Sequence, residues 1–102
     1  MDTSLLETSL SAAVSRLQGT AGDDIPTREL IQQLHVCEKE LVAKRFVRER
    51  DQFGSLRVLR VPGIESALIH VSQALTDLEV RSVEDARVNI EGALEDLAGV
   101  TA

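Results

Sequence analysis

Residues 64–97 read IESALIHVSQALTDLEVRSVEDARVNIEGALEDL and contain two consecutive runs of regularly spaced apolar residues. The first run is Ile64, Leu68, Val71, Leu75 and Leu78, and the second is Val83, Ala86, Ile90, Ala93 and Leu97. Steps of three and four residues place such a run on one face of an α-helix. Because only two or three residues separate the runs, we predict two helices, over about 64–79 and 82–99, that form an antiparallel hairpin. Ser82 is the expected N-cap of the second helix, and Gly99 is its expected end.

Two further helices are predicted in the first half of the chain. Over residues 4–18 the apolar residues again follow the helical spacing, and Ser4 with Glu7 matches a capping box. A polar loop is expected over 19–25. The apolar residues Leu30, Leu34, Cys37 and Leu41 then mark a second helix that begins near Pro26. Since no Gly or Pro follows until Gly54, this helix can exceed about twenty residues.

The segment 46–61 has no single clear periodicity. Val58 and Leu59 are adjacent apolar residues, so a strand and a continuing helix both fit, and 52–55 is expected to be a break. Pro62-Gly63 is interpreted as a turn in either case. The sequence therefore predicts an all-α fold, a small bundle of three to four helices with a C-terminal antiparallel helical hairpin and a short β-hairpin or irregular segment around 46–61. At 102 residues there is room for one domain, 1–102, with one modest core.

The aromatic and cysteine content narrows the classes of function. Phe46 and Phe53 are the only aromatic residues, which argues against nucleic-acid stacking platforms and aromatic interface anchors. Cys37 is the only cysteine, so no intramolecular disulfide forms, and zinc sites built from several cysteines are excluded. A single cysteine without a disulfide partner is typical of a protein in a reducing compartment. Since we find neither a signal peptide nor a membrane-spanning run, we expect a cytoplasmic protein without a membrane partner.

No combination of residues indicates catalysis, a cofactor or a metal. His35 and Cys37 lie two positions apart, about 200° around a helix, and cannot chelate one metal as a pair. Cys37 falls on an apolar stripe, where a cysteine is typically a small buried hydrophobe. His70 lies off the apolar stripe of its helix, where we expect it to be exposed to solvent. Because phosphate-binding loops and nucleophile motifs are also missing, we predict no catalytic, cofactor-binding or metal-binding residues and no enzymatic activity.

Charge is segregated along the chain, whose formal net charge is −6. Residues 44–60 carry six basic and two acidic side chains, while both flanking segments are acidic. The candidate partner-binding residues are these cations and one neighbouring ring, namely Lys44, Arg45, Phe46, Arg48, Arg50, Arg57 and Arg60. They can contact an external polyanion, either nucleic acid or an acidic protein face, or they can pair with acidic groups of the same or a neighbouring subunit.

The segment 26–61 also resembles a winged helix-turn-helix domain. Its parts are a helix over 28–34, a turn at His35-Val36, a second helix over 38–44, and a basic hairpin over 46–61 hinged at 53–55. The resemblance implies a DNA-binding transcriptional regulator whose last two helices mediate dimerisation. In such a protein Glu38, Lys39 and Lys44 would face the major groove and Arg57 the phosphates. The pattern departs from that family at His35, where a glycine is usual.

The leading hypothesis is a non-catalytic protein–protein interaction or assembly module, an adaptor or regulatory helical bundle that self-associates as a homodimer. It is motivated by apolar residues on the predicted second helix beyond one stripe, at Ile31, Val36, Val42, Phe46 and Val47. A bundle this small lacks the surface to cover all of them from within. We therefore expect a protein partner, further copies of the chain included. The alternative is a DNA-binding regulator that uses 44–60.

Overall fold

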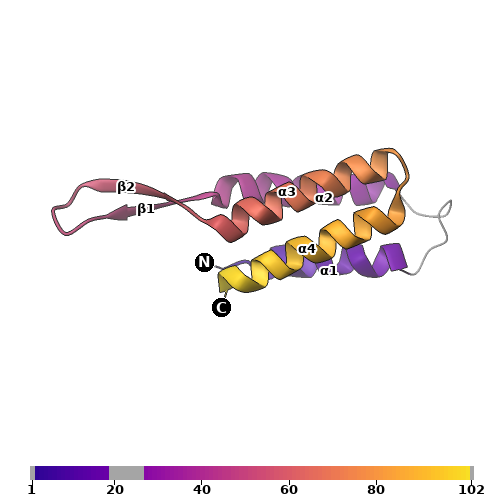
Figure 1. Cartoon of the computed structure of the whole chain (residues 1–102), viewed down its shortest axis with the longest axis horizontal. Coiled ribbons are helices and arrows are strands. Elements are labelled where there is room, and N and C mark those ends of the chain that lie inside the picture. Colours follow the sequence, from indigo (N-terminus) through magenta and orange to yellow (C-terminus); the bar gives the residue numbers. More distant parts are fainter. Residues whose placement is uncertain (1, 19–26, 102) are drawn as a thin grey trace.

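The computed structural model describes residues 2–18 and 27–101, and this part of the chain forms four helices and one two-stranded antiparallel sheet (Figure 1). The elements are α1 (Ser4–Gln18), α2 (Thr27–Lys44), β1 (Phe46–Arg50), β2 (Leu56–Arg60), α3 (Pro62–Glu79) and α4 (Val83–Thr101). The predicted helical bundle with a C-terminal helical hairpin is confirmed, and the segment 46–61 is resolved as a β-hairpin.

The hairpin of α3 and α4 supplies half of a four-helix core. Each helix buries one apolar stripe, and Ile64, Val71 and Leu78 of α3 and Ile90 and Leu97 of α4 are almost completely inaccessible to solvent. Ser82 precedes α4 as predicted, and its carbonyl accepts a hydrogen bond from the Ala86 amide at 3.0 Å. The predicted end at Gly99 is wrong, because α4 continues to Thr101. A glycine lowers helix stability without forcing a helix to stop.

The turn between α3 and α4 contains a backbone conformation that is unfavourable for its residue. Arg81 has a φ of 59°, in the left-handed region, and its amide donates to the Leu78 carbonyl at 3.1 Å. Glycine usually occupies this position after a helix, because a Cβ atom is strained there. We expect Arg81→Gly to raise the free energy of unfolding by about 0.5–1 kcal/mol. Urea denaturation measures this, and a loss of stability would contradict it.

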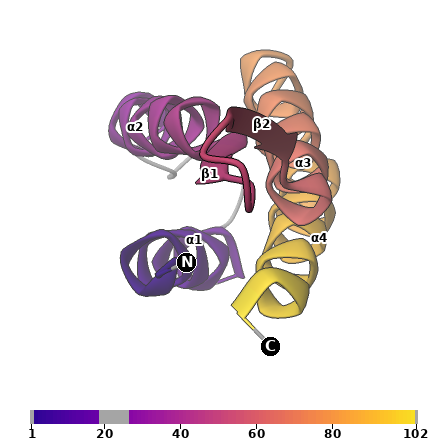
Figure 2. The ribbon, with the colours of Figure 1, turned by 90° about the vertical axis from the view of Figure 1, so that its left-hand side faces the viewer.

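The helices α1 and α2 complete the bundle. In Figure 2, which looks along the long axis, α1 lies beside α4 and α2 lies beside α3. The predicted stripe of α2 is buried in full, at Leu30, Leu34, Cys37 and Leu41. The packing is therefore a ring in which each helix touches two others.

The start of α1 differs from the predicted capping box. The carboxylate of Asp2 accepts hydrogen bonds from the Ser4 amide at 2.9 Å and the Ser4 hydroxyl at 2.7 Å. The Glu7 amide donates to the Thr3 carbonyl at 2.9 Å. The cap therefore lies one to two residues earlier than predicted, and its hydrogen bonds lower the pKa of Asp2.

Two predictions about α2 and one about the start of α3 require correction. The helix is 18 residues long and ends at Lys44, short of the predicted length, because the following residues pair as strands. It runs without interruption through His35 and Val36, so the turn of the helix-turn-helix pattern is absent. Pro62 and Gly63 are not a turn but the first residues of α3, where the fixed φ of proline suits a helix start. The predicted loop over 19–25 lies outside the described residues.

Candidate interaction surface

The β-hairpin projects from one end of the bundle as an isolated ribbon, defined here as residues 46–60 (Figure 1). It accounts for much of the elongated shape, whose principal extents are 58 × 23 × 17 Å. At its base, the Val61 amide donates to the Arg45 carbonyl at 2.9 Å. At its tip, the Asp51 carboxylate accepts from the amides of Phe53 and Ser55, both at 2.9 Å, and Gly54 has a φ of 80°. The predicted hinge at 53–55 is therefore a turn whose backbone is held by hydrogen bonds to the Asp51 side chain.

The register of the two strands gives the ribbon two different sides. Residues directly opposite one another in an antiparallel pair point to the same side, and alternate pairs point to opposite sides. One side, called the ribbon face, is formed by three pairs: Phe46 with Arg60, Arg48 with Val58, and Arg50 with Leu56. All six residues are exposed, with fractions of 44% for Phe46, 56% for Leu56 and 58% for Val58. The ribbon face thus alternates three guanidinium groups with three apolar side chains.

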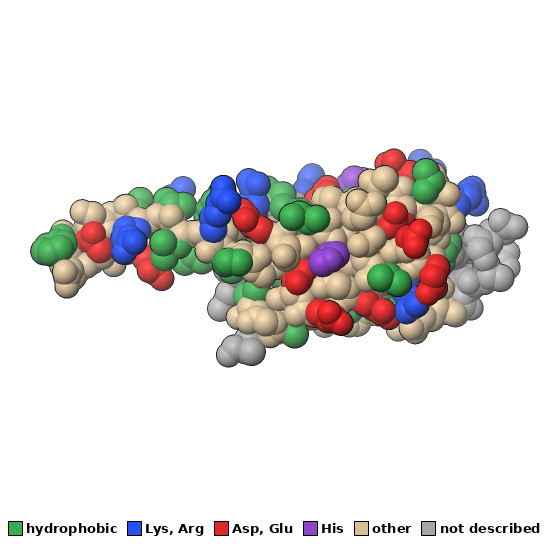
Figure 3. All heavy atoms as spheres, in the orientation of Figure 1, with side chains coloured by type: hydrophobic (Ala, Val, Ile, Leu, Met, Phe, Trp, Pro, Cys, Tyr) green, Lys and Arg blue, Asp and Glu red, His purple; other side chains and the backbone are tan. Residues whose placement is uncertain are grey.

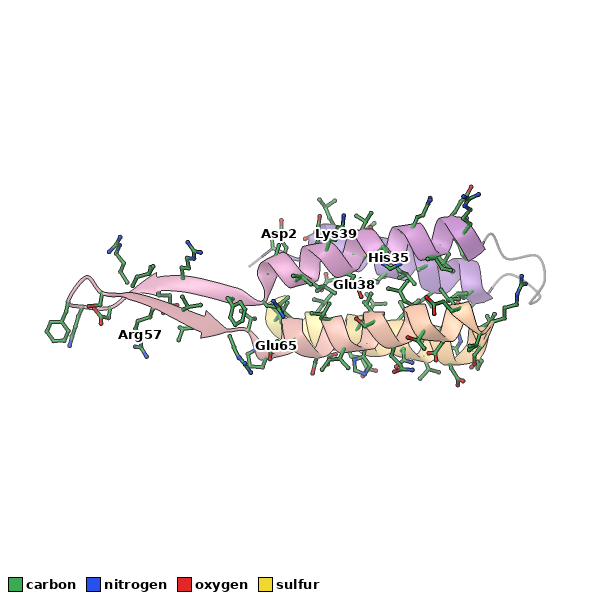
Figure 4. All side chains as sticks on the ribbon, turned by 90° about the horizontal axis from the view of Figure 1, so that it is seen from above. Asp2, His35, Glu38, Lys39, Arg57 and Glu65 are labelled. Carbon is green, nitrogen blue, oxygen red and sulfur yellow. The ribbon has the colours of Figure 1, made fainter. Side chains whose placement is uncertain are left out.

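The opposite side of the ribbon has no net charge. Val47 stands opposite Leu59, both half-buried, and Glu49 stands opposite Arg57. In Figure 4, Arg57 extends from β2 into solvent. Although sequence analysis grouped Arg57 with Arg48, the register separates them onto different sides.

The remaining candidate residues, Lys44 and Arg45, form the junction between bundle and ribbon. Lys44 is the last residue of α2, and both side chains are half-buried. The guanidinium of Arg45 lies 5.3 Å from the centre of the Phe46 ring, within the range of a cation–π contact. Its Nε atom is buried without a hydrogen-bond partner in the described part of the chain. Both cations are therefore less accessible than the arginines of the ribbon face, and Arg45 contacts the base of the ribbon through Phe46.

The cations of the ribbon face are barely neutralised within their own chain. Arg60 Nε lies 3.7 Å from a carboxylate oxygen of Glu65 at the start of α3, which Figure 4 places beside the ribbon base. Among the described residues, Arg48 and Arg50 make no ion pair, and Arg50 instead donates to the Gly54 carbonyl at 2.8 Å. Pairing with acidic groups of the same subunit thus accounts for only one of these three cations.

The outer surface of α3 and α4 carries the opposite charge. Residues 61–102 include eight acidic and two basic side chains, and carboxylates are spread over the face in Figure 3. Arg87 pairs with Glu84 and Glu91 and thereby lowers the pKa of Glu84. Glu95, which is exposed, has no ion-pair partner within 2–18 and 27–101. A negative surface therefore remains available on this hairpin.

His70 lies within the acidic surface and is half-buried, which corrects the prediction that it is exposed. Its Nδ1 atom is 2.7 Å from a carboxylate oxygen of Asp96. A Cβ atom at Gly92 would come within 3.0 Å of the imidazole, so the ring fits because residue 92 has no side chain. The ring therefore lies over α4 and links the two helices.

Two of the clefts on the described helical surface involve α3. The larger, about 470 Å³, lies where α3 begins beside the end of α4 and is lined by Val61, Pro62, Gly63, Glu95, Asp96, Gly99 and Val100. The other, about 310 Å³, separates α2 from α3 and is lined by Glu38, Lys39, Val42, Leu68 and Ser72. Sequence analysis missed both, since each depends on helices that meet only in the folded chain. Gly63 and Gly92 were an available signal of close helix approach, since a Cβ atom at either position would come within 3.0 Å of the neighbouring helix.

The cysteine and the second histidine, Cys37 and His35, both lie on α2. Cys37 is buried, as predicted, and burial raises the pKa of its thiol. His35 Nδ1 lies 3.4 Å from a carboxylate oxygen of Glu38 on the same helix. In the described residues, His, Cys, Asp and Glu side chains do not gather in any group of three or more suited to a metal ion.

Among the described residues, each helix is too short or too polar to cross a membrane.

Comparisons with protein families, curated proteins and solved structures returned no match for this chain.

Proposed function

We propose that this chain is a non-catalytic assembly module that binds protein surfaces, further copies of itself included, through the ribbon face. The observation that carries the proposal is a projecting two-stranded ribbon whose apolar residues Phe46, Leu56 and Val58 face solvent. Two strands without a third strand or a covering layer are marginally stable in water. Binding a protein surface would bury these side chains at about 25 cal/mol per Å² and so stabilise the ribbon.

The composition of the ribbon face suits a protein partner. Arginine is favoured at the centres of protein interfaces, because its planar guanidinium binds carboxylates with two parallel hydrogen bonds and also packs against apolar groups. The alternation of Arg48 and Arg50 with aliphatic neighbours matches a partner surface that is both acidic and apolar. Exposed Val36 and Val42 on α2 add apolar surface. The surplus predicted for this helix is otherwise smaller, because Ile31 packs against the core and Phe46 and Val47 belong to β1.

The opposite charges of two regions of the chain favour self-association. The ribbon face is positive while the α3–α4 surface is negative, so two copies attract each other when these regions meet. We assign this module to the cytoplasm, because the one cysteine is a buried free thiol that suits a reducing compartment.

Arg48→Glu and Arg57→Glu provide a matched test, because each makes the same change of charge on a different side of the ribbon. We expect Arg48→Glu to weaken self-association by about tenfold or more, since it reverses a charge on the ribbon face. Arg57→Glu should change it by less than about threefold. Sedimentation equilibrium at micromolar concentration and physiological salt measures both. A monomeric wild-type protein, or equal losses in the two variants, would contradict the proposal.

Nucleic acid is the second candidate partner, and one observation favours it. The ribbon holds Arg48, Arg50 and Arg57 away from the acidic bundle, which reduces the repulsion that the flanking segments would exert on a phosphate backbone (Figure 1). A two-stranded ribbon also fits the major groove of DNA. Titration against mixed-sequence duplex DNA at two salt concentrations tests this. Submillimolar binding that weakens steeply with salt would favour nucleic acid, and its absence removes this candidate.

A further inference from the structure

We infer that the ribbon face of one copy lies on the α3–α4 surface of a second copy, and that the second copy's ribbon lies on the first. The result is a closed dimer in which the two ribbons are exchanged. This inference rests on the proposed function and adds the mutual exchange of the two ribbons and the cleft that receives the base of each.

The distribution of charge selects the receiving helices. The described segments 2–18 and 27–44, which contain α1 and α2, carry five acidic and four basic side chains. The segment 61–102, which contains α3 and α4, carries eight acidic and two basic side chains. A ribbon face with three arginines is therefore attracted to the α3–α4 surface far more than to the α1–α2 surface.

The cleft at the start of α3 provides a seat for an arginine side chain. Glu95 and Asp96 belong to its lining and bring negative charge to it, although the Asp96 carboxylate is also bound to His70 Nδ1 at 2.7 Å. Val61, Pro62 and Val100 contribute apolar groups that can cover the aliphatic part of such a side chain. Gly63 and Gly99 add no side chains to the cleft. Its volume of about 470 Å³ is ample for one guanidinium group with its methylene stem. Exposed Ile69 and Val88 lie on the same two helices and offer contacts for the apolar residues of the ribbon face.

The dimensions of the chain allow both ribbons to be covered at once. Five paired residues span about 17 Å, and a 19-residue helix such as α4 is about 28 Å long. Two copies related by a two-fold axis near the junction of ribbon and bundle can therefore each lay the ribbon along the other's helices. This arrangement brings the base of each ribbon, with Arg60, to the cleft at the partner copy's Glu95 and Asp96, and Arg48 lies two residues further along the same face. Because both ribbons are used, the assembly closes as a dimer.

Direct pairing of the two ribbons is the competing arrangement. It would join free strand edges into a four-stranded sheet, which edge strands readily do. It would also bring the arginines of two ribbon faces close together, and like charges in register are destabilising. The exchanged arrangement replaces that repulsion with attraction.

Charge exchange between two variants tests the inference. The ribbon variant is Arg48→Glu/Arg60→Glu, and the bundle variant is Glu95→Lys/Asp96→Lys. Each alone places like charges at both contacts, so we expect its self-association to fall by about a hundredfold. An equimolar mixture places opposite charges at both contacts, so we expect a heterodimer of near wild-type affinity. A mixture of the bundle variant with Arg57→Glu is the control, because Arg57 lies on the other side of the ribbon, and it should not recover that affinity.

The outcomes separate the inference from the proposed function. Circular dichroism first establishes that every variant keeps the wild-type helix content, and sedimentation velocity with one labelled component then detects the heterodimer. A wild-type monomer would overturn both the proposed function and the inference. If the wild type is a dimer but the bundle variant also dimerises alone, or the mixture stays monomeric, the inference is overturned and the proposed function stands. The exchanged dimer is supported if each variant by itself is monomeric and the mixture forms a heterodimer of near wild-type affinity.

Discussion

Ile90→Ala is expected to lower the free energy of unfolding by about 3 kcal/mol, the middle of the range for truncating a buried aliphatic side chain. Ile90 is fully buried on α4, the helix that packs against both α3 and α1. Two costs add up to this loss. Fewer apolar atoms are removed from water on folding, and the truncated side chain leaves a cavity that the neighbouring helices fill only in part. For a domain of this size it corresponds to a melting temperature lower by about 15 °C, which calorimetry measures.

Val88→Ala is the matched control for this prediction. Val88 lies two positions earlier on the same helix, and 54% of its surface is exposed. Its truncation should change the free energy of unfolding by no more than about 0.5 kcal/mol. If the two substitutions cost the same, then α4 does not present the face containing Ile90 to the core, and the register of the α3–α4 hairpin is wrong.

The α3–α4 hairpin could be predicted from sequence because its information is local. The spacing of Val83, Ala86, Ile90 and Ala93 allows only one helical face to be buried, and the short link to Leu78 allows only an antiparallel return. The same reasoning placed Leu34 and Cys37 in the core. Periodicity indicates the buried face of a helix even when the neighbouring helix is unknown.

The end of α2 and the ribbon could not be settled in the same way. A strand that packs on a core alternates between apolar and polar residues, but the ribbon packs on nothing and shows no such alternation at Val58 and Leu59. The chain from Lys44 to Val47 also contains no proline or glycine to stop a helix. The sequence therefore left two structures open, and the pairing of β1 with β2 decided between them.

The candidate site was predictable as a segment but not as a surface. Counting charges was enough to select residues 44–60, yet the separation of Arg48 from Arg57 depends on which residues stand opposite one another in the ribbon. The acidic surface around Glu95 and the contact of His70 with Asp96 depend on two helices that meet only after folding. Contacts of this kind, between residues far apart in the chain, produce no periodic pattern in a single sequence.

Asp77→Ala is expected to lower the free energy of unfolding by about 2 kcal/mol, although it removes a charge from an acidic chain. Asp77 is buried near the turn of the α3–α4 hairpin, where its carboxylate accepts hydrogen bonds from Asn89 at 2.7 Å and Gln73 at 3.4 Å. Hydrogen bonds to a charged group contribute about 1.5–3 kcal/mol, and losing one partner leaves the other unpaired. Urea denaturation measures the loss. Asp77→Asn keeps an acceptor oxygen in place and should cost only about half as much.

A double-mutant cycle with Asn89→Ala separates this hydrogen bond from general effects of the substitutions. Asp77→Ala leaves the Asn89 amide without its acceptor, and Asn89→Ala leaves the carboxylate without its closest donor. The double variant removes both groups, so its cost should be smaller than the sum of the single costs by about 1 kcal/mol. Strictly additive costs would mean that the bond contributes nothing to the pairing of α3 with α4. The pairing of α3 with α4, and with it the acidic surface on which the exchanged dimer depends, would then rest on the apolar stripes around residues such as Ile90 and on the contact of His70 with Asp96.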